Sequence, residues 1–502
     1  MLAYLTTALA NIFSVEMFIC MLIGLAVGII IGALPGLSAT LAVALMLPFT
    51  FGLNATAGIL LLVATYCGGI YGGSITAILI SVPGTPASVA SVADGYSLTK
   101  KGQAYDALMF SLYVSVIGGL LSGLALLFIA PTIAKLAVNF GPPEYFALAM
   151  FGLTIIASVS GKSLAKGLMM AGIGLLISCV GIDPYEGQTR FVFGIPALYS
   201  GISMVPVMIG VFAVAEVFKQ IEVHIKSIAS EVSDLEVGKK QKFSLKRLVP
   251  YWGNIIKASI TGIIIGAIPG TGGAIASFLA YNNQKTVSKH PEEFGQGSVE
   301  GLIAAETAKN ATTGATLIPM LTLGIPGDTV TAILLGALTI HGLSTGPKLF
   351  TEHGVLVYTV ILGFFIVNIL MLLEGKAAIR GFAGITKVPS SILMPIILVL
   401  CLVGAYSSNN NWNSVTIALI SGFIGYVLQK FDFPMAPLLI AMVLESLTEM
   451  SLRQSLIMSN NSLSIFVTRP LCLIFLVLAV GSFSLPFIKN RRAQKKQQAG
   501  AN

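Results

Sequence analysis

VGIIIGALPG at 27–36 and TGIIIGAIPG at 261–270 are two versions of one phrase, and this phrase decides the fold. Eight of the ten positions are identical, and the two copies begin 234 residues apart. In each copy an apolar helical run meets Pro-Gly and resumes as a small, hydroxyl-rich segment. A second Pro-Gly follows in each half, in SVPGTPAS at 81–88 and in LGIPGDTVT at 323–331. Paired interruptions in apolar sequence indicate broken membrane helices in two repeated halves.

The composition excludes a soluble protein. Of 502 residues, 55% are hydrophobic and 10% are charged, with a mean hydropathy of +0.89, whereas globular domains carry about 25% charged residues. Residues 17–93 contain no Asp, Glu, Lys, Arg or His. Since one span takes about 20 apolar residues, we predict an all-α polytopic membrane protein with about 11 to 13 membrane segments, some of them half-length. The net charge of +8 lies in connecting loops and does not indicate a nucleic-acid partner.

The pattern predicts four parts of the chain. A first membrane half spans 1–218, a linker 219–250, a second membrane half 251–488 and a tail 489–502. Basic residues dominate the linker and the tail, so both are expected in the cytoplasm. Whether the halves are parallel or inverted stays open, because half-spans make the number of crossings uncertain.

Three local expectations can be compared with the structure. Spans are expected near 196–218 and 464–487, and Asp94–Tyr96 is expected in a polar loop. The glycines at 24, 28 and 32 form a stripe that would let another helix approach closely.

The interruptions are the candidate site. A break at membrane depth frees backbone N–H and C=O groups, which persist only where protein or a water-filled cavity covers them. The restarting helix presents N–H groups and a positive dipole end to an anion, and carbonyls at the end of the preceding half suit a small cation such as Na⁺. Glycines at the breaks would permit close backbone approach.

Charges within membrane segments are further candidates. Glu300, Glu306 and Lys309 are expected on one helix, where Glu306 and Lys309 could simply neutralise each other. Asp328 falls in the first turn of a restarting helix, where capping that helix and binding a coupling cation are both open. His341, in an apolar run, is expected to pack as a neutral side chain.

An intramembrane aspartyl protease is an alternative from another class. Such enzymes share a Tyr-Asp pair and a later Gly-x-Gly-Asp. This chain has Tyr105-Asp106 and Gly327-Asp328, but the first glycine of the second motif is replaced by Ile325. HExxH and a Walker phosphate loop are also missing from the sequence, so no enzyme is predicted.

The chain resembles the large membrane subunit of the tripartite tricarboxylate transporters, the TctA family. The resemblance covers almost the whole chain, and the phrases that carry it are GALPG at 32–36, YGGSITAILISVPGT at 71–85, RFVFG at 190–194, GAIPG at 266–270, VEGLIAAETAKNATTGA at 299–315, LGIPGDTVTAILLGALTIHGL at 323–343 and GPKLF at 346–350. Lys309 departs from the sequence motif of this family, which resembles Pro-Glu-Ala-Ala-Asn-Asn and has Asn at this position.

This resemblance implies a permease that imports a di- or tricarboxylate such as citrate, driven by a Na⁺ or H⁺ gradient and without any other cofactor. Expected partners are a small four-helix membrane subunit and a periplasmic solute-binding protein, in the bacterial inner membrane, and an elevator movement is expected. A passive carboxylate pore is the alternative. The implied substrate neighbourhood is Pro35, Gly36, Ser38, Pro83, Gly84, Thr85, Pro269, Gly270, Thr271, Asn310, Pro326 and Gly327. The implied cation ligands are Asp328, Thr329, Asn310 and Ser38.

Overall fold

The computed structural model describes residues 2–34, 36–138, 140–159, 163–183, 186–226, 243–385 and 390–481. Helices dominate this part of the chain, and the strands within it are β1 (Gly181–Ile182) and β2 (Thr189–Arg190), an antiparallel pair with Gly181 opposite Arg190. Among the described residues, seven helical segments are long and apolar enough to cross a membrane, and five more are apolar but shorter. The all-α polytopic fold is confirmed.

The described residues form two compact units. Unit 1 comprises 1–134 and 205–426, and unit 2 comprises 135–204 and 427–502. Both predicted membrane halves contribute to each unit. The predicted boundaries at the linker and the tail stay predictions, since 227–242 and 482–502 lie outside the described residues.

Unit 1 contains all four Pro-Gly interruptions. Its helices are α1 (Leu2–Ile12), α2 (Val15–Gly32), α3 (Ala39–Met46), α4 (Ala55–Ile80), α5 (Val89–Lys100), α6 (Ala104–Ala137, which runs on into unit 2), α9 (Met204–Met208), α10 (Ala215–Lys226), α11 (Trp252–Ala267), α12 (Gly272–Val287), α13 (Val299–Ala315), α14 (Leu317–Leu323), α15 (Thr329–Ile340), α16 (Pro347–Glu352), α17 (Gly354–Ile385), α18 (Ser390–Asn409) and α19 (Trp412–Lys430, which ends in unit 2). Short 3-10 turns lie at Leu47–Gly52, Pro86–Ser88, Leu245–Tyr251 and Pro291–Glu293.

The centre of unit 1 is α4, whose membrane-length window is buried over its whole circumference. A helix that is apolar on every side is stable only when protein or lipid surrounds it. The predicted glycine stripe packs α2 against α4: a Cβ on Gly28 would lie 2.3 Å from the carbonyl oxygen of Thr65, and one on Gly32 would lie 2.4 Å from that of Gly69. The backbones are therefore in contact, as small residues allow.

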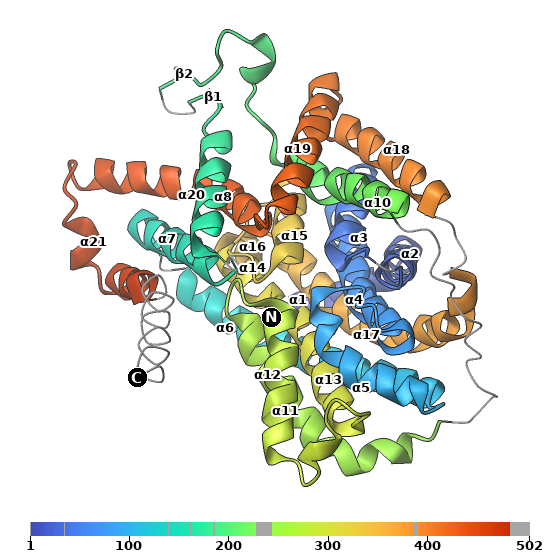
Figure 1. Ribbon diagram of the computed structural model, residues 1–502. Coiled ribbons are helices and arrows are strands. Elements are labelled where there is room, and N and C mark those ends of the chain that lie inside the picture. The colour runs from blue at the N-terminus through green and yellow to red at the C-terminus, as the bar shows by residue number, and fades with distance from the viewer. Residues whose placement is uncertain are drawn as a thin grey trace, which may run out of the picture. The chain divides into compact units, whose positions relative to one another are not determined.

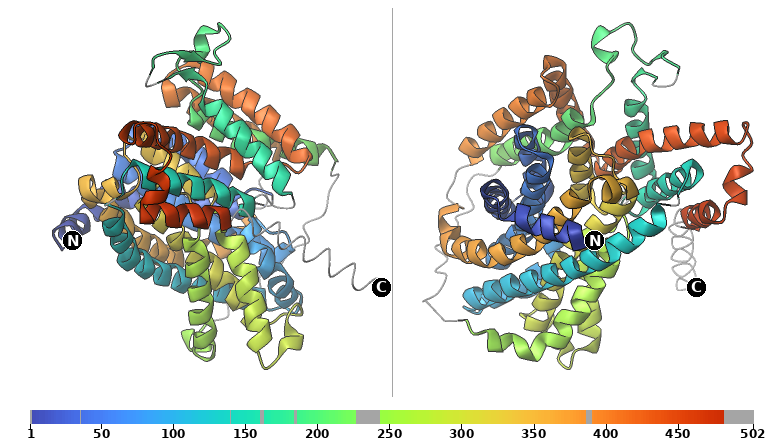
Figure 2. Two further views of the ribbon diagram at one scale, coloured as in Figure 1. Left: turned by 90° about the vertical axis from the view of Figure 1, so that its left-hand side faces the viewer. Right: turned by 180° about the vertical axis from the view of Figure 1, so that it is seen from behind.

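The second copy of the phrase packs in the same way. A Cβ on Gly262 would lie 2.3 Å from the carbonyl oxygen of Ala308, so α11 contacts α13 along its glycines. Helices α11, α12 and α13 pack against one another and lie side by side in Figures 1 and 2. Each copy thus places one broken helix against one largely buried helix.

Unit 2 contains α7 (Pro142–Val159), α8 (Leu164–Ser178), α20 (Ala436–Met458) and α21 (Ile465–Thr468). Helix α20 packs against both α7 and α8. A Cβ on Gly174 of α8 would lie 2.2 Å from the carbonyl oxygen of Leu438, so a glycine again allows the approach. The β1–β2 hairpin follows α8 and extends from its end (Figure 1).

Two of the expected spans begin or end elsewhere. The first starts at Met204, not at 196, because the chain at 199–203 is not helical; it then passes through a π-helical segment (Ile209–Val214) into α10. The segment 464–487 is interrupted at Arg469, whose guanidinium is ion-paired to Glu144 at 2.9 Å.

The expected polar loop at Asp94–Tyr96 is wrong, because these residues lie in α5. The Asp94 carboxylate is buried and accepts three backbone N–H groups, from Gly295 at 2.7 Å, Gly297 at 2.9 Å and Ser298 at 2.8 Å. A carboxylate so bonded can be buried inside a helix–loop contact. Asp94 therefore holds the loop that leads into α13.

Candidate functional site

The first and third interruptions share a backbone conformation. Gly36 and Gly270 are both left-handed, with φ of +82° and +77°, a region that favours glycine. Ser38 caps α3 by accepting the N–H three residues later at 3.2 Å. The Thr271 hydroxyl donates to carbonyl oxygens at the end of α11, one of them at 2.8 Å. These hydroxyls satisfy backbone atoms that the breaks expose.

The second and fourth interruptions correspond in the same way. Ser81 and Gly324 end their helices in the left-handed conformation, with φ of +60° and +71°, and they lie 243 residues apart. The Thr85 hydroxyl bonds the hydroxyl of Ser88 at 2.9 Å. Asp328 caps α15 in a capping box, its carboxylate accepting the N–H three residues later at 2.8 Å. Capping, one of the two roles left open for Asp328, is therefore present.

All four interruptions meet. A Cβ on Gly84 would lie 2.1 Å from a carbonyl oxygen at the end of α2, which joins the second break to the first. A Cβ on Gly273 would lie 3.2 Å from the Cβ of Ala87, which joins the third break to the second. Gly270 donates its N–H to the carbonyl of Gly327 at 2.8 Å, which joins the third break to the fourth. The interruptions form one contiguous region of unit 1, called here the break cluster.

The structure gives two break glycines a role in packing. A Cβ on Gly84 would also lie 2.8 Å from Gly73, and one on Gly327 would lie 2.6 Å from the Cβ of Thr316. The close backbone approach expected at these positions is thus made by helices of the same chain. A side chain at either position would displace a helix.

Buried charges lie beside the break cluster on α13. Glu306 and Lys309 are both 0% exposed, and the Lys309 Nζ lies 2.9 Å from the Glu306 Oε1. The two residues share a helix, as expected, and they form the ion pair that the sequence left open. Because an isolated buried charge is very costly, both groups depend on this partnership.

A second buried polar contact joins α4 to the fourth break. Tyr66 donates its hydroxyl to the Asp328 carboxylate at 2.6 Å and lies 3.3 Å from the hydroxyl of Thr316. Tyr66 on α4 and Lys309 on α13 are 243 residues apart, the same separation as Ser81 and Gly324. Each long buried helix therefore extends a polar side chain toward a break in the other half.

Comparison with known proteins identifies the family. Residues 18–440 match the Tripartite tricarboxylate transporter TctA family. The chain belongs to this family. An "Uncharacterized 52.8 kDa protein in TAR-I ttuC' 3'region" of Agrobacterium vitis is 36% identical over 480 residues, which cover 94% of this chain and 93% of that protein. An "Uncharacterized protein in TAR-II ttuC' 3'region" of the same organism is 35% identical over 236 residues, 47% of this chain and 98% of that protein. No solved structure matches the chain.

The predicted site residues of this TctA-family protein fall into three groups. Thr85, Pro269, Gly270, Pro326 and Gly327 are buried in the break cluster. Gly36 is exposed, and its carbonyl accepts from the amide of Gln220 at 3.2 Å. The partly exposed residues are Ser38, Pro83, Thr271, Asp328 and Thr329. Gly84 is buried like the first group, and Pro35 lies outside the described residues.

Asn310 lies on α13, buried next to the charged pair. Its amide nitrogen donates to Ser115 at 2.7 Å and to the backbone carbonyl of Glu306 at 2.9 Å. Both N–H donors of the amide are therefore used within the protein.

Several residues of this region were not singled out from the sequence. The charged residues are contacted by Tyr66 and Ser74 of α4 and by Ser111 of α6. Thr316, at the junction of α13 with α14, is hydrogen-bonded to Tyr66. Serines in apolar runs carry no local signal, since most of them bond the preceding turn of their own helix. Only the equal separation of Tyr66 and Lys309 from the paired breaks could have drawn attention to Tyr66.

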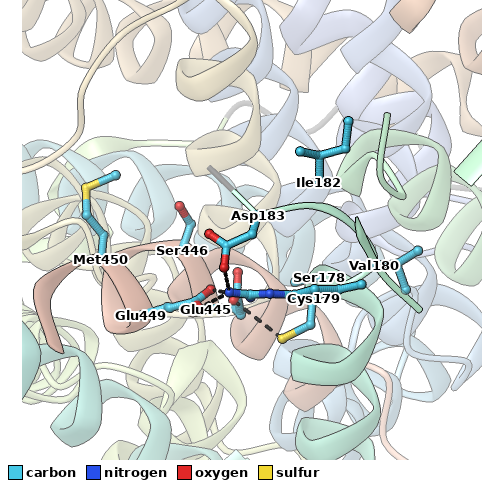
Figure 3. Close-up of a pocket in the computed structure, with 10 residues that line it drawn as sticks. Ser178, Cys179, Val180, Ile182, Asp183, Glu445, Ser446, Glu449 and Met450 are labelled. Atoms are coloured by element: carbon cyan, nitrogen blue, oxygen red, sulfur yellow. Dashed lines mark hydrogen bonds and ion pairs between the residues drawn. The ribbon is translucent and has the colours of Figure 1, made fainter. Parts of the chain in front are cut away.

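Unit 2 of this TctA-family protein contains a separate polar cavity of about 220 Å³. Asp183, Glu445 and Glu449 surround it (Figure 3). Arg190 pairs with Glu449 at 2.9 Å and also with Asp183, and Arg453 pairs with Asp183 at 3.0 Å. The hydrogen bond to Glu449 raises the pKa of the Arg190 guanidinium above its usual value. These ion pairs join the β1–β2 hairpin to α20, so we assign the cluster a structural role.

Proposed function

We propose that this chain is the permease of an importer that moves a di- or tricarboxylate, citrate-like, inward across the bacterial inner membrane, driven by an ion gradient. Membership of the TctA family makes the chain a component of a tricarboxylate transporter. The observation that carries the proposal is the meeting of four helix interruptions in one break cluster, next to buried charges. Interrupted helices that meet in this way form the substrate and ion sites of secondary transporters.

The start of α12 suits a carboxylate best. A side chain caps α3 and another caps α15, whereas no side chain among the described residues caps α12. The first turn of α12 begins with Gly272 and Gly273, which have no side chains of their own to cover its N–H groups. Free N–H groups and the positive end of a helix dipole attract an anion. Thr271 and Thr85 supply hydroxyls beside this turn.

The coupling cation, Na⁺ or H⁺, is proposed to act at Asp328. Its carboxylate is partly exposed within the break cluster, and the adjacent Thr329 begins α15. The Asn310 carbonyl and the Ser38 hydroxyl complete the proposed ligand neighbourhood, and no further cofactor is required.

The partners follow from the family. The large subunit would act with a small four-helix membrane subunit and with a periplasmic binding protein that delivers the carboxylate. Movement of the break cluster against the remaining helices, as in an elevator, would expose the site to each side in turn. The basic tail would lie in the cytoplasm.

The protease alternative has no support in the geometry of its aspartates. Asp106 is ion-paired to Arg247 at 2.6 Å, and Asp328 caps a helix and accepts from Tyr66. Each aspartate thus has a partner of its own, and neither partner is the other aspartate. We propose a transport function without an enzymatic one.

Uptake measurements test the proposal. The two membrane subunits are co-reconstituted in proteoliposomes, the binding protein is added outside, and uptake of radiolabelled citrate and of C4-dicarboxylates is followed. Accumulation above the external concentration, lost when both the Na⁺ and the proton gradient are removed, is expected. Equilibration that ignores both gradients would establish the passive pore instead.

A further inference from the structure

Lys309 is a positive charge with no access to solvent. Its side chain is 0% exposed, in the middle of α13. Burial of an ammonium is tolerated only when opposite charge and hydrogen-bond acceptors replace the water it loses. The atoms that replace this water therefore indicate which kind of ion the site can bind.

Three oxygen atoms surround the ammonium. They are the Glu306 Oε1 at 2.9 Å, the Ser88 Oγ at 3.0 Å and the Ser74 Oγ, which also contacts the ammonium. These residues come from α13, the second break and α4. An ammonium has three donors and no acceptor: the two serine hydroxyls accept hydrogen bonds from it, and the carboxylate oxygen of Glu306 balances its charge.

The oxygens are themselves held in place. The other oxygen of Glu306 accepts from Ser74 at 2.8 Å and from Ser111 at 2.6 Å. Ser88 is bonded to Thr85 at 2.9 Å, within the second break. All these side chains are buried. The cage is preorganised by contacts that do not involve Lys309.

Hydroxyl and carboxylate oxygens from three segments are also the ligands that a hard, small cation takes from a protein. One negative charge sits in the cage, and one positive charge balances it. We propose that Ser74, Ser88 and Glu306 form a site for a monovalent cation, and that the ammonium of Lys309 occupies this site as a tethered ion.

This proposal extends the proposed function to its coupling ion. Because the tethered ammonium cannot leave, Na⁺ does not bind in this cage during transport by the natural protein. A coupling ion acts elsewhere, with Asp328 the remaining acidic group of the break cluster.

Removing the tether tests the site without any transport. In Lys309→Ala the carboxylate of Glu306 loses its ammonium, so the cage should take Na⁺. The purified variant, in detergent, is heated over a series of NaCl concentrations, with choline chloride keeping the ionic strength constant. Saturable stabilisation by Na⁺ is expected, with the ratio of folded to unfolded protein rising about 100-fold at about 100 times the dissociation constant. Bound ²²Na⁺ should approach one ion per chain above the natural protein.

Two controls locate the effect. Lys309→Ala combined with Glu306→Gln removes the charge of the cage and should abolish the response to Na⁺. Lys257→Ala removes an exposed lysine and should respond as the natural protein does. A Lys309→Ala protein that is folded but indifferent to Na⁺ would overturn the proposal, as would an undiminished response in the double variant.

A failure of the Lys309 variants to fold would also decide the question. Lys309→Gln leaves a smaller gap than Lys309→Ala, because its side chain is only one atom shorter than lysine, and it supplies a neutral oxygen, so it repeats the test if Lys309→Ala does not fold. If neither single variant folds at any NaCl concentration, the cage does not accept a free cation and the proposal fails. None of these measurements uses substrate or partners, so they stand or fall separately from carboxylate import.

Discussion

At the scale of single residues, three carboxylates of unit 1 are distinguished by their partners. Asp94 is bound by backbone N–H groups, Glu306 by an ammonium and two hydroxyls, and Asp328 by its own helix and a tyrosine. A carboxylate bound by backbone groups holds a loop, whereas one bound by side chains from other helices connects elements that could move. The predictions at this scale separate these roles.

Asp328→Asn distinguishes helix capping from cation binding. Asparagine caps a helix about as well as aspartate and can still accept from Tyr66, so apparent melting temperature and membrane insertion should stay near those of the natural protein. The negative charge is lost, so gradient-driven uptake should fall at least about tenfold, the equivalent of about 1.4 kcal/mol. Uptake is measured in proteoliposomes that contain both membrane subunits, with the binding protein added outside.

Asp328→Ala is the matched variant. It removes both charge and cap, and it should lower stability by about 1 kcal/mol in addition to the loss of uptake. Normal uptake by Asp328→Asn would leave capping as the role of this residue and would refute its assignment to the cation.

Asp94→Ala should destabilise the protein strongly. It removes three charge-assisted hydrogen bonds and leaves three N–H groups near 295–298 without an acceptor, a cost of about 3 kcal/mol or more. The measurement is the apparent melting temperature in detergent. The control is Asp106→Ala, which breaks a partly exposed ion pair to Arg247 worth about 0–1 kcal/mol. Equal losses in the two variants would contradict the role assigned to Asp94.

At the scale of elements, glycine decides which helices touch. Helix α2 contacts α4, and α11 contacts α13, through glycines at corresponding places in the repeated phrase. In a bilayer, where lipid is as apolar as leucine, such close packing is a main source of helix association. The breaks that follow these helices are thereby held against the two buried helices that carry Tyr66 and Lys309.

Gly262→Ala should therefore be destabilising. Its Cβ would lie 2.3 Å from the carbonyl oxygen of Ala308, so α11 must move away from α13, at a cost of about 1–3 kcal/mol. Gly253 is on the same helix with nothing within 4 Å of its added Cβ, and Gly253→Ala should be neutral or stabilising by up to about 1 kcal/mol. Thermal unfolding in detergent compares the two variants. A harmless Gly262→Ala would mean that the helices are not in contact.

At the scale of the whole molecule, the basic residues set the orientation in the membrane. The linker 219–250 contains seven Lys and Arg residues against four acidic ones, and the tail after 488 is rich in Lys and Arg. Both segments are expected on the cytoplasmic side. This places an even number of membrane crossings between them.

Reporter fusions check this orientation. A fluorescent protein fused after Asn502, or inserted within the linker, should fluoresce, and alkaline phosphatase at the same positions should be inactive, because each reporter matures on one side of the inner membrane only. Replacing the lysines and arginines of the tail by glutamine tests whether the tail charge contributes. Phosphatase activity at either position would contradict the predicted topology.

Much of this architecture was readable from local sequence. Hydropathy predicted the helical membrane fold, the repeated phrase located the breaks, and the stripe of glycines predicted the close packing of α2. Each of these features depends on residues that are neighbours along the chain. The pairing of Glu306 with Lys309 and the capping by Asp328 were foreseen for the same reason, since both act within one or two helical turns.

What the sequence determined by itself was thus the set of local elements: apolar helices, the places where they break, and the charges they carry. Tertiary structure alone decided that the four breaks meet, that Tyr66 reaches Asp328, and that Ser74 and Ser88 surround Lys309. It also turned Asp94 from an expected loop residue into a buried acceptor for N–H groups about 200 residues away. The physical reason is that a hydroxyl or a carboxylate in an apolar run acquires a partner only when another helix packs beside it, and the partner's identity depends on contacts far apart in the chain.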